Sequence, residues 1–375
     1  MTEIYLIRHI QAEGNLYVAM QGHWDGDETA LGLRQAELLG ERFRNVPLDA
    51  LYSSDLRRAR VTAAAIGKHH DLPLRCDRRL REIDMGRWEG RFFADLLHEE
   101  PEAIRTFLQD EETWHMDGAE RYADVAQRAM AALREIAEQN EGGAVAVVSH
   151  GVTIRCVLKA ALGLSWDEMK ALPVADNTAV THLFYEHGAF RADFINDASH
   201  LRVLELPPWG KTPLLRAEPL ELKRYGDWYA DCYADAWRTA HGSLRGFEAE
   251  PYLRSAAEHA GRDPESLLRF FCGEEPIGIL ETDPQRGRNA GYGWVSLLYL
   301  RPAYRNRGLG VQILGRAVLR GKAQGLRALR LNAAEKNAPA LAFYRKWGFR
   351  ELSSENNSFG TLLLLEKKLG GVGHV

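Results

Sequence analysis

Cysteine is scarce in this sequence, and no two cysteines stand at short spacing. The 375-residue chain has four, none of them in a CxxC motif: Cys76, Cys156, Cys232 and Cys272. Disulfide frameworks and structural zinc sites need cysteines at regular or close spacing, so neither is expected. The thirteen histidines form no HExxH motif, and we expect no protein-bound metal. This cysteine usage favours a reducing compartment, so we expect a cytoplasmic protein.

A charge excess and long apolar runs are also missing. The 48 Lys and Arg residues nearly balance 52 Asp and Glu, for a formal net charge of −4. That balance lacks the basic footprint of a nucleic-acid or membrane-surface protein. No run of about 18 apolar residues is present to span a membrane. Residues 2–9 have the pattern of a strand and not of a signal peptide. We expect neither a nucleic acid nor a membrane as partner, and nothing here indicates an oligomeric state.

The length of the chain favours two domains, at roughly 150 residues per domain. The stretch LPPWGKTP at 206–213 contains three prolines and one glycine and interrupts the surrounding pattern. We therefore predict one domain over residues 1–205, a linker over 206–212 and a second domain over 213–375.

The first domain alternates strand and helix patterns. Short apolar runs at 4–7 and 144–149 predict buried strands. Helical patterns occur at 31–43, 57–69, 124–139 and 151–163, the last with Gly163 as a C-cap. This alternation predicts an α/β sandwich with a mostly parallel sheet.

Four separated motifs in this domain point to phosphate chemistry. They are LIRHIQAEGN at 6–15, LYSSDLRRARVTAAAI at 51–66, LREIDMGRWEG at 80–90 and VVSHGVTIRCVL at 147–158. Arg8 and His9 end a predicted strand, and α/β folds bind ligands at the carboxyl ends of parallel strands. In sequence and order the four motifs resemble those of the histidine phosphatase superfamily. The resemblance implies the phosphoglycerate-mutase-like three-layer α/β sandwich.

The resemblance also implies a role for each polar residue of the motifs. His9 would be the nucleophile and form a phosphohistidine, and Glu82 would protonate the leaving group and then activate water. The phosphate would be held, without a metal, by Arg8, Asn15, Arg58 and His150. Buried arginines should lower the pKa of His9 and keep it unprotonated.

Several residues of the motifs leave alternatives open. Asp84 and Glu89 are rivals of Glu82 for the role of acid. Arg58 is preferred to Arg57 because it directly precedes Ala59, as in the family, and Arg57 is expected on a solvated face. Two positions depart from the family pattern. Ile10 replaces a small residue and is expected to crowd the pocket mouth, and Arg121 stands at the serine position of a Gly-Glu-Ser element.

The second half of the chain begins with an aromatic stripe at 225–237, which we expect to face a core. A hairpin is predicted at 267–283 and a strand at 294–300. The strand runs into Arg305-Asn306-Arg307-Gly308-Leu309-Gly310 and then a long helix pattern. Glycines before a helix N-terminus can hold a pyrophosphate on backbone N–H groups. The spacing fits neither GxxxxGK[ST] nor GxGxxG.

This loop resembles the [QR]xxGx[GA] signature of the GNAT N-acetyltransferases, and residues 328–349 resemble that family's next strand and helix. The resemblance implies an α+β fold with a mixed, mostly antiparallel sheet and acetyl-CoA as cosubstrate. Cofactor contacts would come from Leu298, Leu300, Arg305, Asn306, Arg307, Gly308, Leu309, Gly310 and Asn337. Tyr344 would protonate the thiolate, unless it is a core aromatic beside Phe343 and Trp347. The general base is either Glu281 or a relayed water.

These patterns lead to one main hypothesis and three alternatives. The main one is a bifunctional enzyme that hydrolyses a small-molecule phosphate ester and acetylates a small-molecule or peptide amine. In one alternative, the GNAT-like domain only binds acetyl-CoA as a sensor. In another, the first domain transfers phosphoryl groups like a phosphoglycerate mutase. In the third, Ile10 makes that domain an inactive binding module. The sequence names neither substrate, because loops vary freely on both folds.

Overall fold

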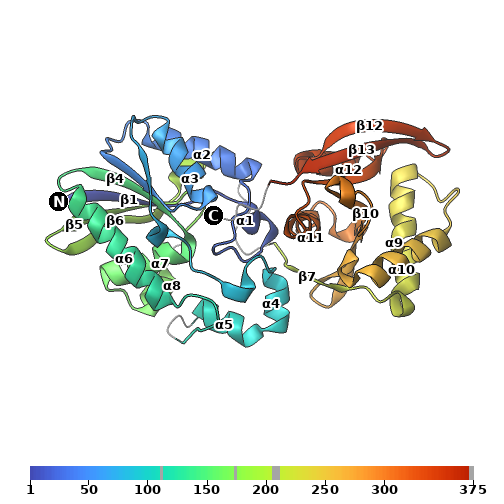
Figure 1. Ribbon diagram of the computed structural model, residues 1–375, viewed down its shortest axis with the longest axis horizontal. Helices are drawn as coiled ribbons and strands as arrows, with labels where there is room; N and C mark the ends of the chain where they lie inside the picture. Colours follow the sequence, from blue (N-terminus) through green and yellow to red (C-terminus); the bar gives the residue numbers. More distant parts are fainter. Residues whose placement is uncertain (110–112, 173–174, 205–211, 371–375) are drawn as a thin grey trace. The chain divides into compact units, whose positions relative to one another are not determined.

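A computed structural model describes residues 1–109, 113–172, 175–204 and 212–370. The chain divides into two compact units, Met1–Leu206 and Pro207–Val372 (Figure 1). Apart from Thr212, the linker predicted at 206–212 lies outside the described residues. Among the residues described, no helix has both the length and the apolar character that crossing a membrane requires.

The first unit is a sheet between two helical layers, as the sequence predicts. Its strands are in the order β3-β2-β4-β1-β5-β6. The pairs β1–β4, β2–β4 and β2–β3 are parallel, and the pairs β1–β5 and β5–β6 are antiparallel. The elements are β1 (Thr2–Arg8), α1 (Glu13–Tyr17), α2 (Ala30–Phe43), β2 (Ala50–Ser53), α3 (Arg57–Gly67), β3 (Leu74–Cys76), α4 (Phe93–Glu99), α5 (Pro101–Gln109), α6 (Tyr122–Gln139), β4 (Ala144–Ser149), α7 (Gly151–Leu162), α8 (Trp166–Ala171), β5 (Val180–Glu186) and β6 (Ala189–Asp197).

The central strands of this sheet are buried on both faces because their residues are apolar on both sides. Helices α2 and α3 cover one face, where Ile7 and Val148 are buried. Helices α6 and α7 cover the other, where Ile4 and Leu6 are buried (Figure 1). Gly163 ends α7 in the left-handed conformation with φ 65°, as predicted. This packing fixes the carboxyl ends of β1 and β4 side by side.

The second unit has a mixed sheet in the order β12-β13-β11-β10-β9-β8-β7. Within the part of the chain that the structure describes, β10 and β11 are the one parallel pair of this sheet, so the predicted mostly antiparallel sheet is confirmed. The elements are β7 (Leu215–Pro219), α9 (Leu222–His241), α10 (Ala249–Arg262), β8 (Leu267–Cys272), β9 (Glu275–Asp283), β10 (Tyr292–Leu300), α11 (Gly310–Ala323), β11 (Ala328–Ala334), α12 (Ala338–Lys346), β12 (Arg350–Asn357) and β13 (Gly360–Lys368).

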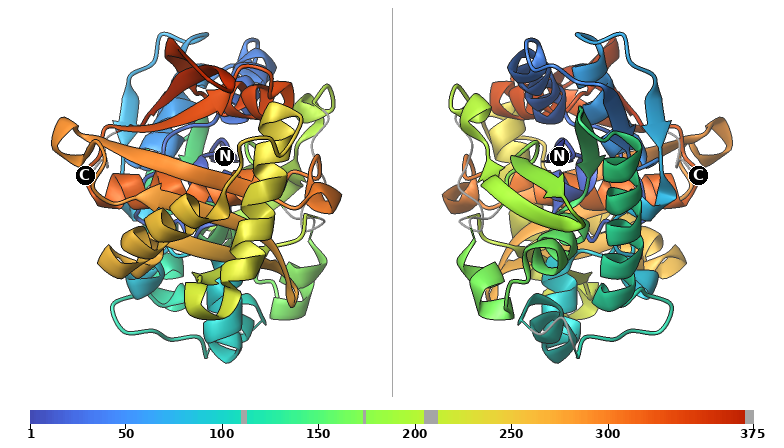
Figure 2. Two further views of the ribbon diagram at one scale, coloured as in Figure 1. Left: turned by 90° about the vertical axis from the view of Figure 1, so that its right-hand side faces the viewer. Right: turned by 90° about the vertical axis from the view of Figure 1, so that its left-hand side faces the viewer.

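The aromatic stripe of α9 does face a core. Tyr229 is fully buried, and Tyr225, Trp228 and Tyr233 pack on the same cluster as strand residues Ile279 and Leu297. Figure 2 shows α9, in yellow, lying across the orange strands of its sheet. The hairpin predicted at 267–283 forms β8 and β9.

Candidate active sites

Two histidines meet at the carboxyl ends of neighbouring strands in the first unit. His9 follows β1 and His150 follows β4, and the parallel register pairs Arg8 with Ser149. The two imidazole centroids are 5.0 Å apart. Only 4% of His9 and none of His150 is exposed. The fold therefore brings together two histidines that are 141 positions apart.

His9 is held in one tautomer. Its Nδ1 lies 2.6 Å from the carbonyl oxygen of Ile10, and a carbonyl can only accept, so Nδ1 carries the proton. The lone pair of a neutral ring is then on Nε2. Burial, followed by the charges of Arg58 and Arg8, lowers the pKa of His9 well below its ordinary value. The ring is thus neutral and lies in an arginine-rich environment.

His150 has an unusual environment for a buried polar ring. Neither of its nitrogens has a hydrogen-bond partner within the described part of the chain. Burial and the charge of Arg58 also lower its pKa well below the ordinary value. Since buried polar atoms are nearly always hydrogen-bonded, this orphaned imidazole indicates a position that a polar ligand completes.

Arg58, in the first turn of α3, is fixed by a buried acid that the sequence did not reveal. Its Nη1 donates to Asp25 Oδ1 at 3.1 Å, and the two side chains are 0% and 2% exposed. Its Nη2 donates to the carbonyl oxygen of Gly22 at 2.7 Å. The neighbouring Arg57 instead forms a two-bond pair with Glu28 at 2.9 Å, with half its side chain exposed. The preference for Arg58 over Arg57 therefore agrees with the geometry.

Arg8 and Glu82 flank the first residue of α7. A side chain at Gly151 would begin 3.6 Å from Arg8 Nε and 3.7 Å from Glu82 Oε2. Arg8 also donates to the carbonyl oxygen of Ala175. The arginine and the carboxylate thus converge where β4 passes through His150 into α7.

The Glu82 carboxylate is oriented by backbone groups. Its Oε1 accepts the N–H groups of Ile83 at 3.1 Å and Thr153 at 3.0 Å, and Oε2 accepts that of Val152 at 3.2 Å. The hydroxyl of Thr153 lies 3.2 Å from Oε1 as well. Oε1 is therefore the saturated oxygen, and Oε2 is the one available for a proton.

The two rival carboxylates hold loops together. Glu89 accepts four backbone N–H groups at 2.7–3.2 Å, those of Gly22, His23, Trp24 and Met85. Asp84 accepts the N–H of Gly86 at 2.8 Å and lies 3.4 Å from His23 Nδ1. Glu82 accepts backbone N–H groups as well, so what favours it as the acid is the place of its Oε2 beside Gly151 and Arg8.

Asn15 and Ile10 differ from what the motif suggests. Asn15 Oδ1 accepts the N–H of Ala12 at 3.1 Å and caps α1, so at least its oxygen has a structural contact. The expectation that Ile10 crowds the pocket mouth is wrong. Its side chain is fully buried in a cluster with Ala36, Ala65 and Val61, between α2 and α3. The physical reason is that two alanines leave room for a branched side chain.

The second unit opens between its two parallel strands. Strands β10 and β11 pair only from Tyr292 to Trp294, and the last pair is Trp294 with Arg330. The N–H of Arg301 donates to Ile277 on β9. Since bonding alternates along an antiparallel pair, the backbone groups of Leu298 and Leu300 then face away from β9, toward the opening. The Leu300 carbonyl already accepts Arg305 Nε at 2.8 Å.

The loop after β10 presents a row of free backbone donors. For the N–H groups of residues 306–310, no acceptor is found among the residues that the structure describes. Asn306 and Gly308 have φ values of 59° and 75°, and a Cβ at Gly308 would meet nothing within 4 Å. The 14-residue helix α11 begins at Gly310. Such a loop, with the positive end of a helix, fits a pyrophosphate.

Arg305 is turned away from this row of donors. Its Nη2 pairs with Asp235 of α9 at 2.8 Å, and its Nε bonds Leu300. Its backbone N–H donates to the carbonyl oxygen of Pro302 at 3.1 Å. Arg305 therefore anchors the loop, and the cradle that the sequence predicts is left to residues 306–310. Arg307 instead lies over Tyr304, with 5.4 Å from its guanidinium carbon to the ring centroid.

The three remaining predicted residues have distinct environments. Asn337 caps α12, accepting the N–H of Ala340 at 3.3 Å. Tyr344 is 8% exposed and packs on Phe343 and Phe349, and burial raises the pKa of its hydroxyl. Glu281 is 2% exposed, with its oxygens held by Tyr229 at 2.7 Å and His259 at 2.8 Å. This internal network argues against Glu281 as the general base.

Comparison with known proteins agrees with this division of the chain. Residues 4–198 match the histidine phosphatase superfamily (branch 1), and residues 222–349 match the acetyltransferase (GNAT) family. The chain belongs to the histidine phosphatase superfamily and carries a GNAT domain in the same polypeptide. Both resemblances seen in the sequence motifs are thereby confirmed, and the two families indicate an enzyme.

Two similar proteins each match about half of the chain. The probable phosphoglycerate mutase GpmB of Salmonella choleraesuis (strain SC-B67) is 31% identical over 207 residues, which cover 54% of this chain and 95% of the relative. The solved structure of YhfR from Bacillus stearothermophilus is 33% identical and has a TM-score of 0.52. Its alignment covers 54% of this chain and all of that one.

Proposed function

We propose that the chain is a bifunctional enzyme. The first unit would hydrolyse phosphomonoesters through a phosphohistidine, without a metal, and the second would transfer acetyl from acetyl-CoA to a primary amine. The observation that carries the first activity is the meeting of His9 and His150 beside Arg8 and the buried Arg58, with His9 Nδ1 locked as a donor. A phosphate ester needs a neutral nucleophile and fixed cationic donors, and this site has both.

The hydrolytic steps follow from these positions. His9 Nε2 attacks phosphorus as the bond to the ester oxygen breaks, while Arg8, Arg58 and His150 hold the nonbridging oxygens. Glu82 Oε2 gives its proton to the leaving alkoxide. Water then attacks the phosphohistidine, passes a proton back to Glu82 and releases orthophosphate. Asn15 could add a contact through its amide nitrogen.

Phosphohistidine trapping tests this activity. With p-nitrophenyl phosphate as probe, rapid acid-free quenching should show base-stable, acid-labile label on the wild-type chain and none on His9→Ala. Label that persists in His9→Ala would refute the assignment. Incubation with 3-phosphoglycerate distinguishes hydrolysis, which yields orthophosphate, from mutase chemistry, which yields 2-phosphoglycerate.

The second activity rests on the free N–H groups at 306–310 and the opening between β10 and β11. Acetyl-CoA would supply the activated thioester. The loop would bind its pyrophosphate, and Leu298 and Leu300 would offer backbone groups to the pantetheine arm. Tyr344 stays protonated because burial raises its pKa, so it can give a proton to the thiolate. With Glu281 enclosed, a relayed water is the better candidate for the base.

The two sites are proposed to work independently, in domains 1–205 and 213–375 joined by residues 206–212. Each set of functional residues lies within one compact unit. His9→Ala should therefore leave acetyl transfer within about twofold of wild type, and Tyr344→Phe should slow acetyl transfer but not phosphate release. Loss of both activities in either variant would contradict independence. Acetyl-CoA binding without transfer to any amine would favour the sensor alternative.

A further inference from the structure

A pocket lies on the sheet of the second unit, beside the last pair of β10 and β11. Strands β10 to β13 and the β9–β10 loop all contribute to it, through residues that include Arg286, Tyr292, Trp294, Arg330, Asn332 and Glu355. Its cavity volume is about 170 Å³. A cavity of roughly 150 Å³ can hold a molecule of the size of benzene, so this pocket has room for a small ligand or for one end of a larger one.

Two arginines of this pocket are stacked on aromatic rings. The guanidinium carbon of Arg286 is 3.3 Å from the Trp294 ring centroid, and that of Arg330 is 4.0 Å from the Tyr292 centroid. Tyr292 and Trp294 are two positions apart on β10 and so share one face of the sheet. Stacking holds the planar guanidinium in place while its N–H donors stay free to bind an anion.

The two arginines differ in charge compensation. Arg330 Nε is 2.7 Å from Glu366, so its charge is neutralised. Arg286 forms no ion pair with any residue the structure describes. Asp283 accepts the backbone N–H of Arg286 at 3.0 Å, and its carboxylate also interacts with the charge of the Arg286 side chain. Glu355 is the one carboxylate among the described lining residues. The pocket thus offers one guanidinium without an ion-paired carboxylate among the described residues, and one carboxylate.

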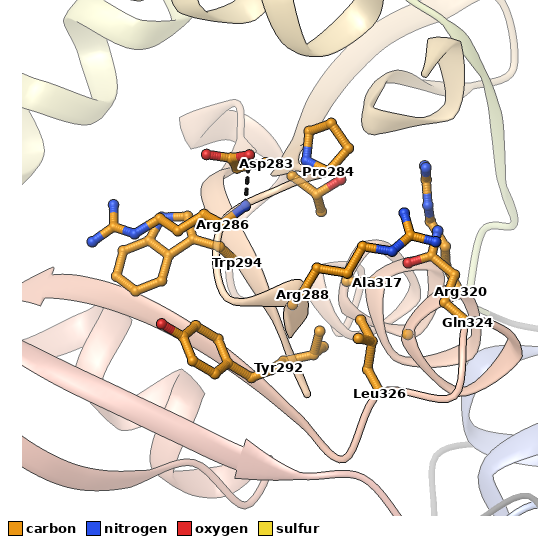
Figure 3. Close-up of a pocket in the computed structure, with 14 residues that line it drawn as sticks. Asp283, Pro284, Arg286, Arg288, Tyr292, Trp294, Ala317, Arg320, Gln324 and Leu326 are labelled. Carbon is orange, nitrogen blue, oxygen red and sulfur yellow. Dashed lines mark hydrogen bonds between the residues drawn. The ribbon is translucent and has the colours of Figure 1, made fainter. Parts of the chain in front are cut away.

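The neighbouring arginine provides an internal contrast. In Figure 3, Arg286 extends alongside Trp294, whereas Arg288 extends toward Ala317, Arg320 and Gln324 of α11. Both side chains belong to exposed residues of the same loop. Figure 3 draws an adjoining pocket that both arginines line, whereas the pocket described above is lined by Arg286 and not by Arg288. Stacking on Trp294 therefore distinguishes Arg286 from a generic surface charge.

The position of the pocket relates it to acetyl transfer. Trp294 and Arg330 form the last pair before the strands part, and both line the pocket. Asn332 lies two residues farther along β11, where β10 no longer pairs with it. A molecule in the pocket would therefore reach the opening in which the proposed function places the thioester.

We infer that this pocket binds the acyl acceptor, and that the acceptor carries an anionic group, a carboxylate or a phosphate, in addition to its amine. The inference rests on the proposed acetyl transfer. Arg286 binds the anionic group, and Glu355 attracts the ammonium form of the amine before it is deprotonated. A polyamine fits less well, because Arg286 would repel one of its ammonium groups.

Matched acceptor pairs test the inference on the full chain. L-lysine is compared with cadaverine for the carboxylate, and O-phosphoethanolamine with ethanolamine for the phosphate. The phosphate pair is measured in the His9→Ala background so that the ester survives. At least one anion-bearing member should have a kcat/KM at least tenfold above that of its partner. The pair that shows the larger ratio identifies the anion.

Arg286→Ala should raise KM for the preferred acceptor at least tenfold and leave its uncharged partner within about twofold. Arg286→Lys should recover part of the loss. Arg288→Ala is the matched control and should change neither value. Equal use of both members of each pair, or a uniform loss in Arg286→Ala, would overturn the inference while acetyl transfer stands.

If no amine is acetylated, the proposed function fails and a binding measurement decides the inference. Glutarate is then titrated by calorimetry into the chain loaded with CoA. If glutarate binds wild type, and its affinity falls at least tenfold in Arg286→Ala but not in Arg288→Ala, the anion site is supported. Equal binding to wild type and Arg286→Ala, or no binding to wild type, would overturn it.

Discussion

The two candidate sites are built from different parts of the polypeptide. In the first unit, ionisable side chains form the site, and each buried charge has a fixed partner, as Arg58 has Asp25. In the second, the proposed cofactor cradle consists of backbone N–H groups and an unpaired strand edge. A side-chain site depends on which residues are present. A backbone site depends on which side chains are absent, above all at Gly308.

The largest effect is expected at the backbone site. Gly308→Glu should abolish acetyl-CoA binding measured by calorimetry, because a carboxylate would enter the pyrophosphate space and oppose its charge. Gly325→Glu is the matched control. Gly325 also has a positive φ, 71°, and open surroundings, so backbone strain is similar. Equal acetyl-CoA affinity of wild type and a folded Gly308→Glu variant would show that the loop at Gly308 does not bind the pyrophosphate.

A smaller effect is expected for the acid of the side-chain site. Glu82→Gln should slow hydrolysis of alkyl phosphates roughly 100-fold, because their leaving groups need a proton. The loss on p-nitrophenyl phosphate should be much smaller, since its leaving group is already stable as an anion. A similar loss on both substrates would show that Glu82 positions the site and does not donate the proton.

The buried partner of Arg58 tests how firmly the side-chain site is fixed. Asp25→Ala would leave a buried guanidinium without its acid, and should lower the free energy of unfolding by about 3 kcal/mol. Glu28→Ala removes the partner of the half-exposed Arg57 and should cost at most about 1 kcal/mol. Denaturant titration of both variants makes the comparison. Similar losses of unfolding free energy in the two variants would mean that burial of the ion pair does not determine its contribution to stability.

The pH dependence of phosphate release should reflect the lowered pKa of His9. A nucleophile with a lowered pKa stays neutral at pH values where an exposed histidine is protonated. The acid limb of kcat/KM for p-nitrophenyl phosphate should therefore lie below a pH of roughly 6.5. A midpoint at or above that value would indicate an exposed His9.

In the second unit a histidine has a raised pKa and not a lowered one, and this should make the stability of the unit fall as pH rises. The hydrogen bond to Glu281 raises the pKa of His259 above its ordinary value. Its contribution is therefore complete below a pH of roughly 6.5 and is lost as pH rises through the raised pKa. His259→Gln should lower the Tm more at pH 6 than at pH 9. An equal decrease at both pH values would show that the proton on His259 does not matter.

The sequence predicted the strands that end at His9 and His150, because strand–helix alternation places the ends of both strands at one sheet edge. Glu82 came from the resemblance of its motif alone, since no predicted element includes it. It did not reveal Asp25, since a loop aspartate has no pattern until folding places it under Arg58. It misjudged Ile10, because the direction of a side chain depends on packing partners far along the chain. The pocket at Arg286 was invisible for the same reason, as it combines five segments.

The burial of Ile10 also limits how this sequence can change. Ala36 and Ala65 are small where the isoleucine needs room. Replacing Ile10 with a small residue such as alanine would leave a cavity between α2 and α3 and cost roughly 3 kcal/mol. Enlarging either alanine first would instead clash with the isoleucine. The side-chain sizes at these three positions therefore depend on one another. A smaller residue at position 10 would need larger residues on α2 and α3 to fill the space.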